Sequence, residues 1–145
     1  MFTKLTEQLK ANPKTIVFTE GTDPRIQDAA AKLTAEGILN VILLGNPDAV
    51  KLTAADAKYD ISKCEIIDPA RYADKDAMVE KMVELRKGKM TEEQVRDALS
   101  KGNYFGTMLV KMGKADCLLG GATYSTADTV RPALQLIKTC LLYTS

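Results

Sequence analysis

Four short apolar runs alternate along this chain with segments that have helical periodicity. The runs occupy residues 15–19, 39–44, 64–68 and 116–120, and the segments between them repeat apolar residues three and four positions apart. Near-continuous apolar runs are typical of strands that are buried on both faces. The pattern therefore predicts an α/β fold of three layers, with a mostly parallel sheet and helices on both of its faces.

Capping residues place the predicted helices. Asp23 or Thr22 can cap a helix that has Pro24 in its first turn, and Thr91 opens a capping box with Gln94. Helices are predicted over 3–11, from Pro24 until Gly37, after Pro47, over 75–87, 91–100 and 104–112, and in a last segment that runs to about Thr139.

Composition limits the classes of partner. The chain has 145 residues and a formal net charge of +1, so it lacks the basic excess of nucleic-acid-binding proteins. Apolar runs such as 41–44 are too short to span a bilayer, and the first residues lack the order of a secretory signal. We therefore expect a cytoplasmic protein with no nucleic-acid or membrane partner.

The sequence contains no histidine. A Ser-His-Asp triad, a Cys-His pair and an HExxH zinc site are therefore excluded within these residues. Cys64, Cys117 and Cys140 are widely spaced and form no CxxC pair, so we expect reduced thiols and no metal site. Chemistry within this chain must use arginine, carboxylates, hydroxyls and backbone amides.

Two loops that follow predicted strands are candidate ligand sites, because ligands of open α/β sheets bind at the carboxyl ends of the strands. The first loop, 19–25, contains Glu20, Asp23 and Arg25. These residues suit a charged ligand. A helix cap with a local pair between Asp23 and Arg25 explains them equally well.

The second loop has the sequence GGATYSTADTVRP and covers residues 120–132. Its two glycines allow a sharp turn, Ser125 or Thr126 can cap the next helix, and amides there are expected to face a bound anion. Arg131 lies six residues after Ser125 and can lean back toward such an anion. This design suits phosphate.

A simpler interpretation of the second loop is that its hydroxyls only cap a helix while Asp128 pairs with Arg131 at i, i+3. Pro132 leaves the start of that helix open. Either the helix begins near Ser125 and is kinked at Pro132, or it begins near Thr129 with Pro132 in its first turn.

Several long motifs resemble bacterial phosphate acetyltransferases. They are VFTEGTDPRIQDAAAKL at 17–33, ELRKGKMTEEQVRDAL at 84–99 and GGATYSTADTVRPALQLIKT at 120–139, in the order of the family. The resemblance implies interconversion of acetyl-CoA plus phosphate with coenzyme A plus acetyl phosphate. It implies a homodimer of two-domain subunits that resemble isocitrate and isopropylmalate dehydrogenases in fold. It also implies that no metal or other cofactor is bound, and that coenzyme A and acetyl-CoA are substrates.

The same resemblance implies roles for particular residues. In the family the arginines that correspond to Arg86 and Arg131 hold phosphate or coenzyme A, and Ser125, Thr126 and Thr129 match phosphate contacts. From composition alone, Arg86 is better explained as a cation at a helix end.

The family's pattern also marks what this chain lacks. Tyr124 stands where many members have histidine, so it is given no acid–base role. The carboxylate that is proposed as base for the coenzyme A thiol falls after Thr139 in the family. We therefore expect no catalytic residue within this chain, and residues 1–139 to form the N-terminal part of the acyltransferase domain.

Three other functions stay open at this stage. They are a phosphate butyryltransferase-like enzyme, a phosphate-binding module without catalysis, and a regulatory domain fused to another enzyme. Residues 140–145, CLLYTS, match one reading frame of a common sequencing adaptor, so we expect a non-native tail. Reading the genomic frame past Lys138 tests that expectation.

Overall fold

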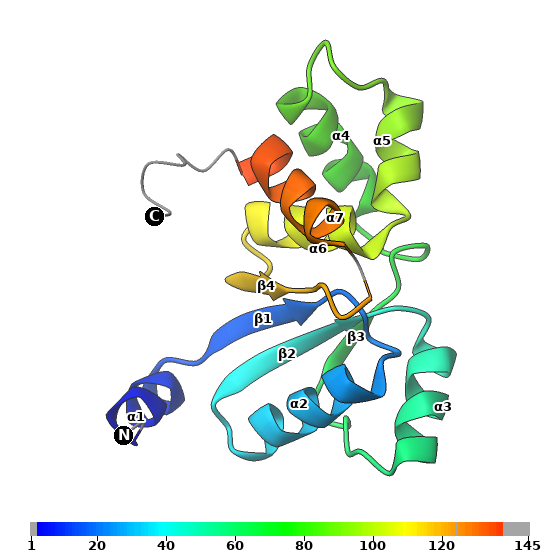
Figure 1. Cartoon of the computed structure of the whole chain (residues 1–145). Coiled ribbons are helices and arrows are strands. Elements are labelled where there is room, and N and C mark those ends of the chain that lie inside the picture. The colour runs from blue at the N-terminus through cyan, green and yellow to red at the C-terminus, as the bar shows by residue number, and fades with distance from the viewer. Residues whose placement is uncertain (1–2, 124, 138–145) are drawn as a thin grey trace.

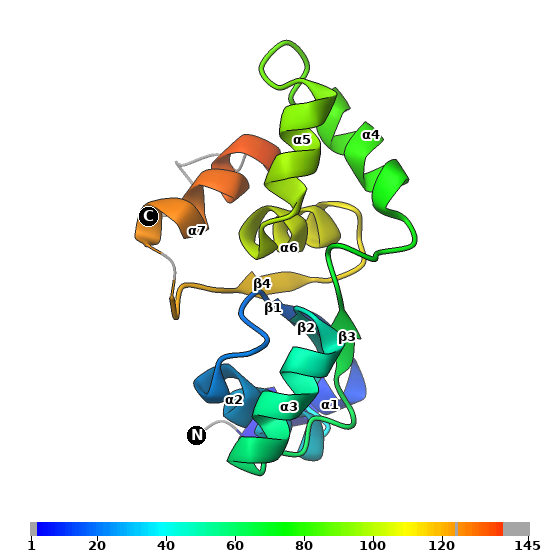
Figure 2. The same ribbon diagram turned by 90° about the vertical axis from the view of Figure 1, so that its right-hand side faces the viewer.

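A computed structural model describes residues 3–123 and 125–137 of the chain. Tyr124, the predicted helix end near Thr139 and the tail 140–145 lie outside the described residues. Figure 1 shows a central sheet with helices above and below it, and Figure 2 shows the same layers from the side. The prediction of a mostly parallel α/β sheet that is covered on both faces is confirmed.

The sheet has four parallel strands in the order β3-β2-β1-β4 within the described residues. Each predicted run forms one strand: β1 Lys14–Phe18, β2 Leu39–Leu44, β3 Glu65–Ile67 and β4 Cys117–Leu119. In the register, Val17 lies between Ile42 of β2 and Leu118 of β4. β1 is therefore a central strand, with β4 added on the side opposite β2.

Two predicted caps are confirmed: Asp23 caps its helix through a side-chain oxygen, and Thr91 and Gln94 form the predicted capping box. Asn46 caps the helix that begins at Pro47 in the same way, which was not predicted. The helices are α1 Thr3–Ala11, α2 Pro24–Ala35, α3 Pro47–Ala57, α4 Lys75–Leu85, α5 Glu92–Leu99, α6 Gly102–Lys111 and α7 Thr126–Pro132, followed by the π-helical turn η1 Ala133–Ile137.

Successive residues of β1 pack into two hydrophobic cores, one on each face of the sheet. Val17 packs with α4, α5 and α6 on one face, whereas Phe18 packs with α2 and α3 on the other, and both are at most 1% exposed. Because successive strand residues point to opposite faces, one short strand supports both layers. Gln27 of α2 is also buried and donates to the carbonyls of Gly21 and Val50, which ties the β1–α2 loop to α3.

The helix after β4 begins at Thr126 and contains Pro132, so the first of the two alternatives for this segment is confirmed. Proline has no N–H to donate to the carbonyl of Asp128. The side chain of Asn103, on α6, donates to that carbonyl instead, at 2.8 Å. The chain then continues as η1 rather than as regular α-helix.

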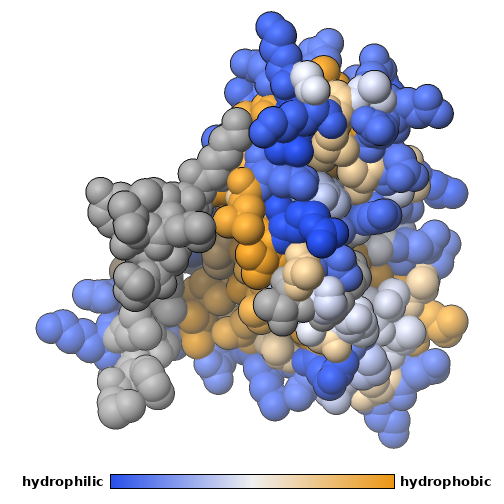
Figure 3. Space-filling model, turned by 45° about the horizontal axis from the view of Figure 1, so that its top comes forward, coloured by the Kyte–Doolittle hydropathy of each residue, from blue (hydrophilic) through white to orange (hydrophobic). Residues whose placement is uncertain are grey.

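One side of the molecule exposes apolar side chains. Leu119, Val130 and Leu134 are 50%, 43% and 46% exposed. Figure 3 shows apolar surface on the side where β4 and η1 lie. Among the helices described here, none is both long enough and apolar enough to cross a membrane.

Candidate functional site

The two candidate loops meet where β1 and β4 end. β1 continues into α2 on one face of the sheet, and β4 leads to α7 on the other face (Figure 1). The two loops therefore start side by side at the carboxyl ends of neighbouring parallel strands and lead to opposite faces of the sheet. Such a switch point is the usual ligand site of open α/β sheets. The position predicted for the site is therefore consistent with this topology.

Glu20 occupies the amides of the second loop. One carboxylate oxygen accepts hydrogen bonds from the amides of Gly121 and Ala122 at 2.8 and 2.9 Å, and the other accepts from the amide and the hydroxyl of Thr123. The amides of residues 121–123 therefore face a carboxylate of the same chain, and the binding of an external anion at the helix start stays a prediction. Glu20 and Gly121 lie 101 positions apart in the sequence, so no local pattern could indicate this contact.

The environment of Glu20 keeps it ionised. Burial by itself raises the pKa of a carboxyl group. The hydrogen bonds from Thr123, Ala122 and Gly121 outweigh burial, so the pKa of Glu20 lies below its ordinary value. Glu20 is 8% exposed, and the hydrogen bonds from the loop offset the cost of burying its charge.

The first loop carries a local pair in addition. The carboxylate of Asp23 accepts from the amide of Arg25 at 2.8 Å and pairs with its guanidinium at 2.7 Å. The hydrogen bond from the Arg25 side chain is the main reason that the pKa of Asp23 lies below its ordinary value. Arg25 also donates to the carbonyl of Ala122 at 3.2 Å, which adds a second link between the loops.

Ser125, Asp128 and Arg131 form a chain of contacts along α7. The Ser125 hydroxyl accepts from the amide of Asp128 and donates to its carboxylate at 2.9 Å, so Ser125 is the helix cap. The other carboxylate oxygen of Asp128 lies 4.0 Å from the Arg131 guanidinium, whose side chain is 59% exposed. The structure thus contains the cap and the i, i+3 pair, and leaves Arg131 accessible.

The remaining predicted loop residues lie on the same helix. Thr129 donates its hydroxyl to the carbonyl of Ser125 at 3.1 Å. A β-carbon added to Gly121 would lie 3.4 Å from the Thr129 hydroxyl, so Thr129 faces the loop. Thr126 is the first residue of α7, and its side chain lies outside what the structure describes.

Arg86 lies at the end of α4, beside a separate cavity of about 420 Å³. The cavity is also lined by Lys89, Lys101 and Gln135, and Asp97 is the carboxylate among its lining residues. The Nε of Arg86 is buried and has no hydrogen-bond partner among the described residues. Gln135 belongs to η1, so this cationic cavity connects α4 with the turn that follows Arg131.

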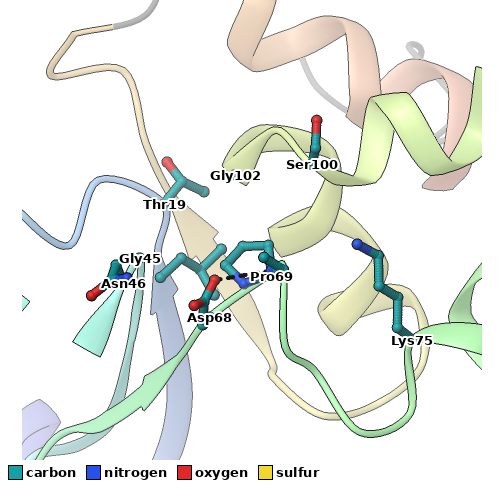
Figure 4. A pocket seen from close by; sticks show the side chains of 10 residues that line it. Thr19, Gly45, Asn46, Asp68, Pro69, Lys75, Ser100 and Gly102 are labelled. Carbon is teal, nitrogen blue, oxygen red and sulfur yellow. Dashed lines mark hydrogen bonds between the residues drawn. The ribbon is translucent and has the colours of Figure 1, made fainter. Parts of the chain in front are cut away.

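A further cavity of about 300 Å³ lies outside the ends of β1, β2 and β3, and no sequence pattern indicated it. Figure 4 shows Thr19, Asp68, Lys75 and Ser100 around it. The Thr19 hydroxyl is buried without a hydrogen-bond partner among the described residues. Neither predicted arginine lines this cavity.

Metal ligands do not gather in the described residues. No group of three or more Asp, Glu or Cys side chains is arranged there to hold a metal ion. Cys64 and Cys117 are free thiols, and burial is the main reason that the pKa of each lies above its ordinary value.

Comparison with known proteins now defines the family. A family model described as phosphate acetyl/butaryl transferase matches residues 1–141. The chain belongs to this family. It is 47% identical over 139 residues to phosphate acetyltransferase of Bacillus subtilis (strain 168), and 48% identical over 135 residues to phosphate acetyltransferase of Staphylococcus aureus (strain MRSA252).

Solved structures agree with this assignment. A EutD phosphotransacetylase from Staphylococcus aureus and a phosphotransacetylase from Streptococcus pyogenes each match with a TM-score of 0.88 and 47% identity. The matches cover 94% and 93% of this chain, but 42% and 41% of those chains. The curated relatives from Bacillus subtilis and Staphylococcus aureus are covered to 43% and 41% of their length.

Proposed function

We propose that the full-length protein is a phosphate acetyltransferase, which transfers an acetyl group between coenzyme A and inorganic phosphate. The observation that carries the proposal is the match of residues 1–141 to the family model, supported by relatives of about 47% identity that are named for this activity. The cytoplasmic location expected from the sequence and the homodimer implied by the family resemblance are part of the proposal.

We assign phosphate binding to residues of α7. Arg131 is accessible, and its pair with Asp128 is long and exposed, so its release costs little. A guanidinium binds two phosphate oxygens in fixed geometry, which orients the dianion beside a thioester. Ser125 caps the same helix, Thr126 is its first residue and Thr129 faces the loop, and we assign all three as further phosphate contacts.

Arg86 is assigned to coenzyme A or phosphate through the cavity at the end of α4. Three cations face one carboxylate among its lining side chains, and the Arg86 Nε lacks a partner within the described chain. An anionic phosphate ester in the cavity balances this excess of positive charge. This placement supports a substrate role over the solvated helix end that composition favours.

In the proposed reaction, a phosphate oxygen attacks the acyl carbon of acetyl-CoA, the C–S bond breaks, and coenzyme A leaves as its thiol or thiolate. The reverse reaction needs a thiolate, and a thiol of ordinary pKa is mostly protonated at neutral pH. We assign the base for that step to the part of the family protein that this chain does not cover. The described residues then bind and orient phosphate.

The rest of the architecture follows from the same proposal. We also propose that residues 1–139 form the N-terminal part of a two-domain acyltransferase of the isocitrate dehydrogenase type. We propose that residues 140–145 are a non-native tail, of which the family model matches the first two residues. The apolar side chains of Leu119, Val130 and Leu134 are exposed, which supports the proposal that further polypeptide of the full-length protein packs against β4 and α7.

The direct test uses the full-length protein that the natural reading frame encodes. With acetyl-CoA and phosphate, we expect release of free coenzyme A together with an equal amount of acetyl phosphate. Omission of phosphate is the control and should abolish both. If the protein binds phosphate esters but forms no acyl phosphate, the enzyme proposal is wrong and the phosphate-binding module is the better explanation.

The butyryl alternative is kept because the family model covers both kinds of transferase. The relatives compared above are named for acetyl transfer, so we expect acetyl-CoA to be preferred. An acyl pocket that rejects two extra methylenes discriminates by at least about tenfold in kcat/KM. Equal or better use of butyryl-CoA in the same assay would reverse the assignment.

A further inference from the structure

The hydrogen bonds of Glu20 join the two loops at the switch point. Both of its carboxylate oxygens accept from the β4–α7 loop, through the amides of Gly121, Ala122 and Thr123 and the Thr123 hydroxyl. Three consecutive amides that converge on one carboxylate fix the backbone of this loop. These three amides are occupied by Glu20, so a substrate anion at this site is bound by other groups.

We propose that Glu20 is a positioning residue of the phosphate site, an inference that rests on the proposed function above. Residues 121–123 are anchored by Glu20, and Ser125, two residues further, caps α7. Anchoring the loop therefore sets where α7 begins and how it presents Arg131. Glu20 acts on phosphate through this helix, without contact to the substrate.

The carboxylate is specifically required by the geometry. Four donors face two oxygens, and every one of them needs an acceptor. A glutamine at this position keeps one oxygen but turns an NH₂ group toward part of the donors. The loop residues 121–123 are themselves exposed, so an amide that loses its acceptor on the buried Glu20 would turn to water, and the loop would leave its conformation.

Asp116 offers a matched control on the same two strands. Its carboxylate accepts from the amide of Thr15 at 2.8 Å, and its own amide donates to the Thr15 carbonyl at 2.8 Å. This contact joins the start of β4 to β1, at the end of the strands away from the phosphate loop. Asp116→Asn therefore removes a carboxylate charge on the same two strands, keeps an oxygen that can accept from the Thr15 amide, and does not touch residues 121–123.

The experiment compares Glu20→Gln with Asp116→Asn in the full-length protein. We measure KM for phosphate and for acetyl-CoA separately, together with hydrogen exchange of the peptide that contains residues 121–123. Glu20→Gln is expected to raise the KM for phosphate about tenfold, which corresponds to about 1.4 kcal/mol, and to speed exchange in that peptide. The KM for acetyl-CoA should change by less than about twofold.

The control defines a purely structural role. Asp116→Asn should leave the KM for phosphate and the exchange of residues 121–123 near wild type. Equal shifts of KM in both variants, or an unchanged KM beside accelerated exchange in Glu20→Gln, would overturn the proposal. If the wild-type protein transfers no acetyl group, the proposed function fails, while hydrogen exchange still reports whether Glu20 orders the loop.

Thr123→Val keeps the test decisive if Glu20→Gln does not fold. It removes the hydroxyl donor to Glu20 and leaves the three amides and the side-chain shape in place. The KM for phosphate should shift in the same direction by a smaller factor. No shift in a folded Thr123→Val protein that shows faster loop exchange would contradict the positioning role.

Discussion

The side-chain amide of Asn103 donates to the carbonyl of Asp128 at 2.8 Å, and this is the carbonyl that Pro132 cannot bond. One contact therefore replaces the missing hydrogen bond of α7 and docks the helix on the start of α6. Ser125 and Arg131 lie on either side of it along α7. The proline and the asparagine act as a pair.

Asn103→Ala should lower the free energy of unfolding by about 1 kcal/mol, because a hydrogen bond of this kind is lost. In a Pro132→Ala background, position 132 regains an N–H that can pair with Asp128. The same Asn103→Ala change should then cost less, and denaturant unfolding of the four proteins of the cycle measures the coupling. Strictly additive costs would show that the two residues are independent.

Gly120 packs directly against the side chain of Thr19. A β-carbon at Gly120 would lie 2.5 Å from the Thr19 hydroxyl, which is too close for a contact. Gly120→Ala should therefore cost about 1–3 kcal/mol of stability, as other overpacked sites do. In the Thr19→Ala background the clash is absent and the cost should largely disappear. Thermal unfolding gives both values, and a persistent cost would place the strain elsewhere.

The low pKa of Glu20 predicts a dependence of stability on pH. Because its folded pKa lies below the ordinary value of 4.5, the ionised group stabilises the fold at neutral pH, and this contribution is lost as pH falls below about 4.5. The stability difference between wild type and Glu20→Gln should therefore be largest near pH 7 and shrink toward pH 3. Denaturant unfolding at several pH values measures it, and a constant difference would contradict the assignment.

Local signals predicted most of the fold. The apolar runs located all four strands, and side-chain caps such as Asp23 and Thr91 placed helix starts. Helix α6 begins two residues earlier than predicted, at Gly102 rather than Tyr104. The pair between Asp128 and Arg131 was part of the simpler interpretation of the second loop, because residues at i, i+3 on one helix are neighbours.

Contacts between distant segments were beyond such signals. The bond of Glu20 to the loop at Gly121 spans 101 positions, and the cavity at Arg86 needs η1 to pack beside α4 and α6. In the sequence, Glu20 and the glycine-rich loop can each be explained by local structure alone. Only the parallel pairing of β1 with β4 brings the two together.

The most direct test of the account concerns Arg131, the accessible arginine of α7. In the full-length protein, Arg131→Ala should lower kcat/KM for phosphate about 10- to 100-fold, since one or two charged hydrogen bonds are lost, while thermal stability stays near wild type. Arg96→Ala is the matched control, because Arg96 is an arginine of α5 whose pairs with Glu92 and Asp76 are exposed.

Initial rates of acetyl phosphate formation at varied phosphate decide the outcome. The account predicts a large loss for Arg131→Ala and nearly unchanged rates for Arg96→Ala. Unchanged use of phosphate by a folded Arg131→Ala enzyme would contradict the assignment of α7 as the helix that holds the phosphate.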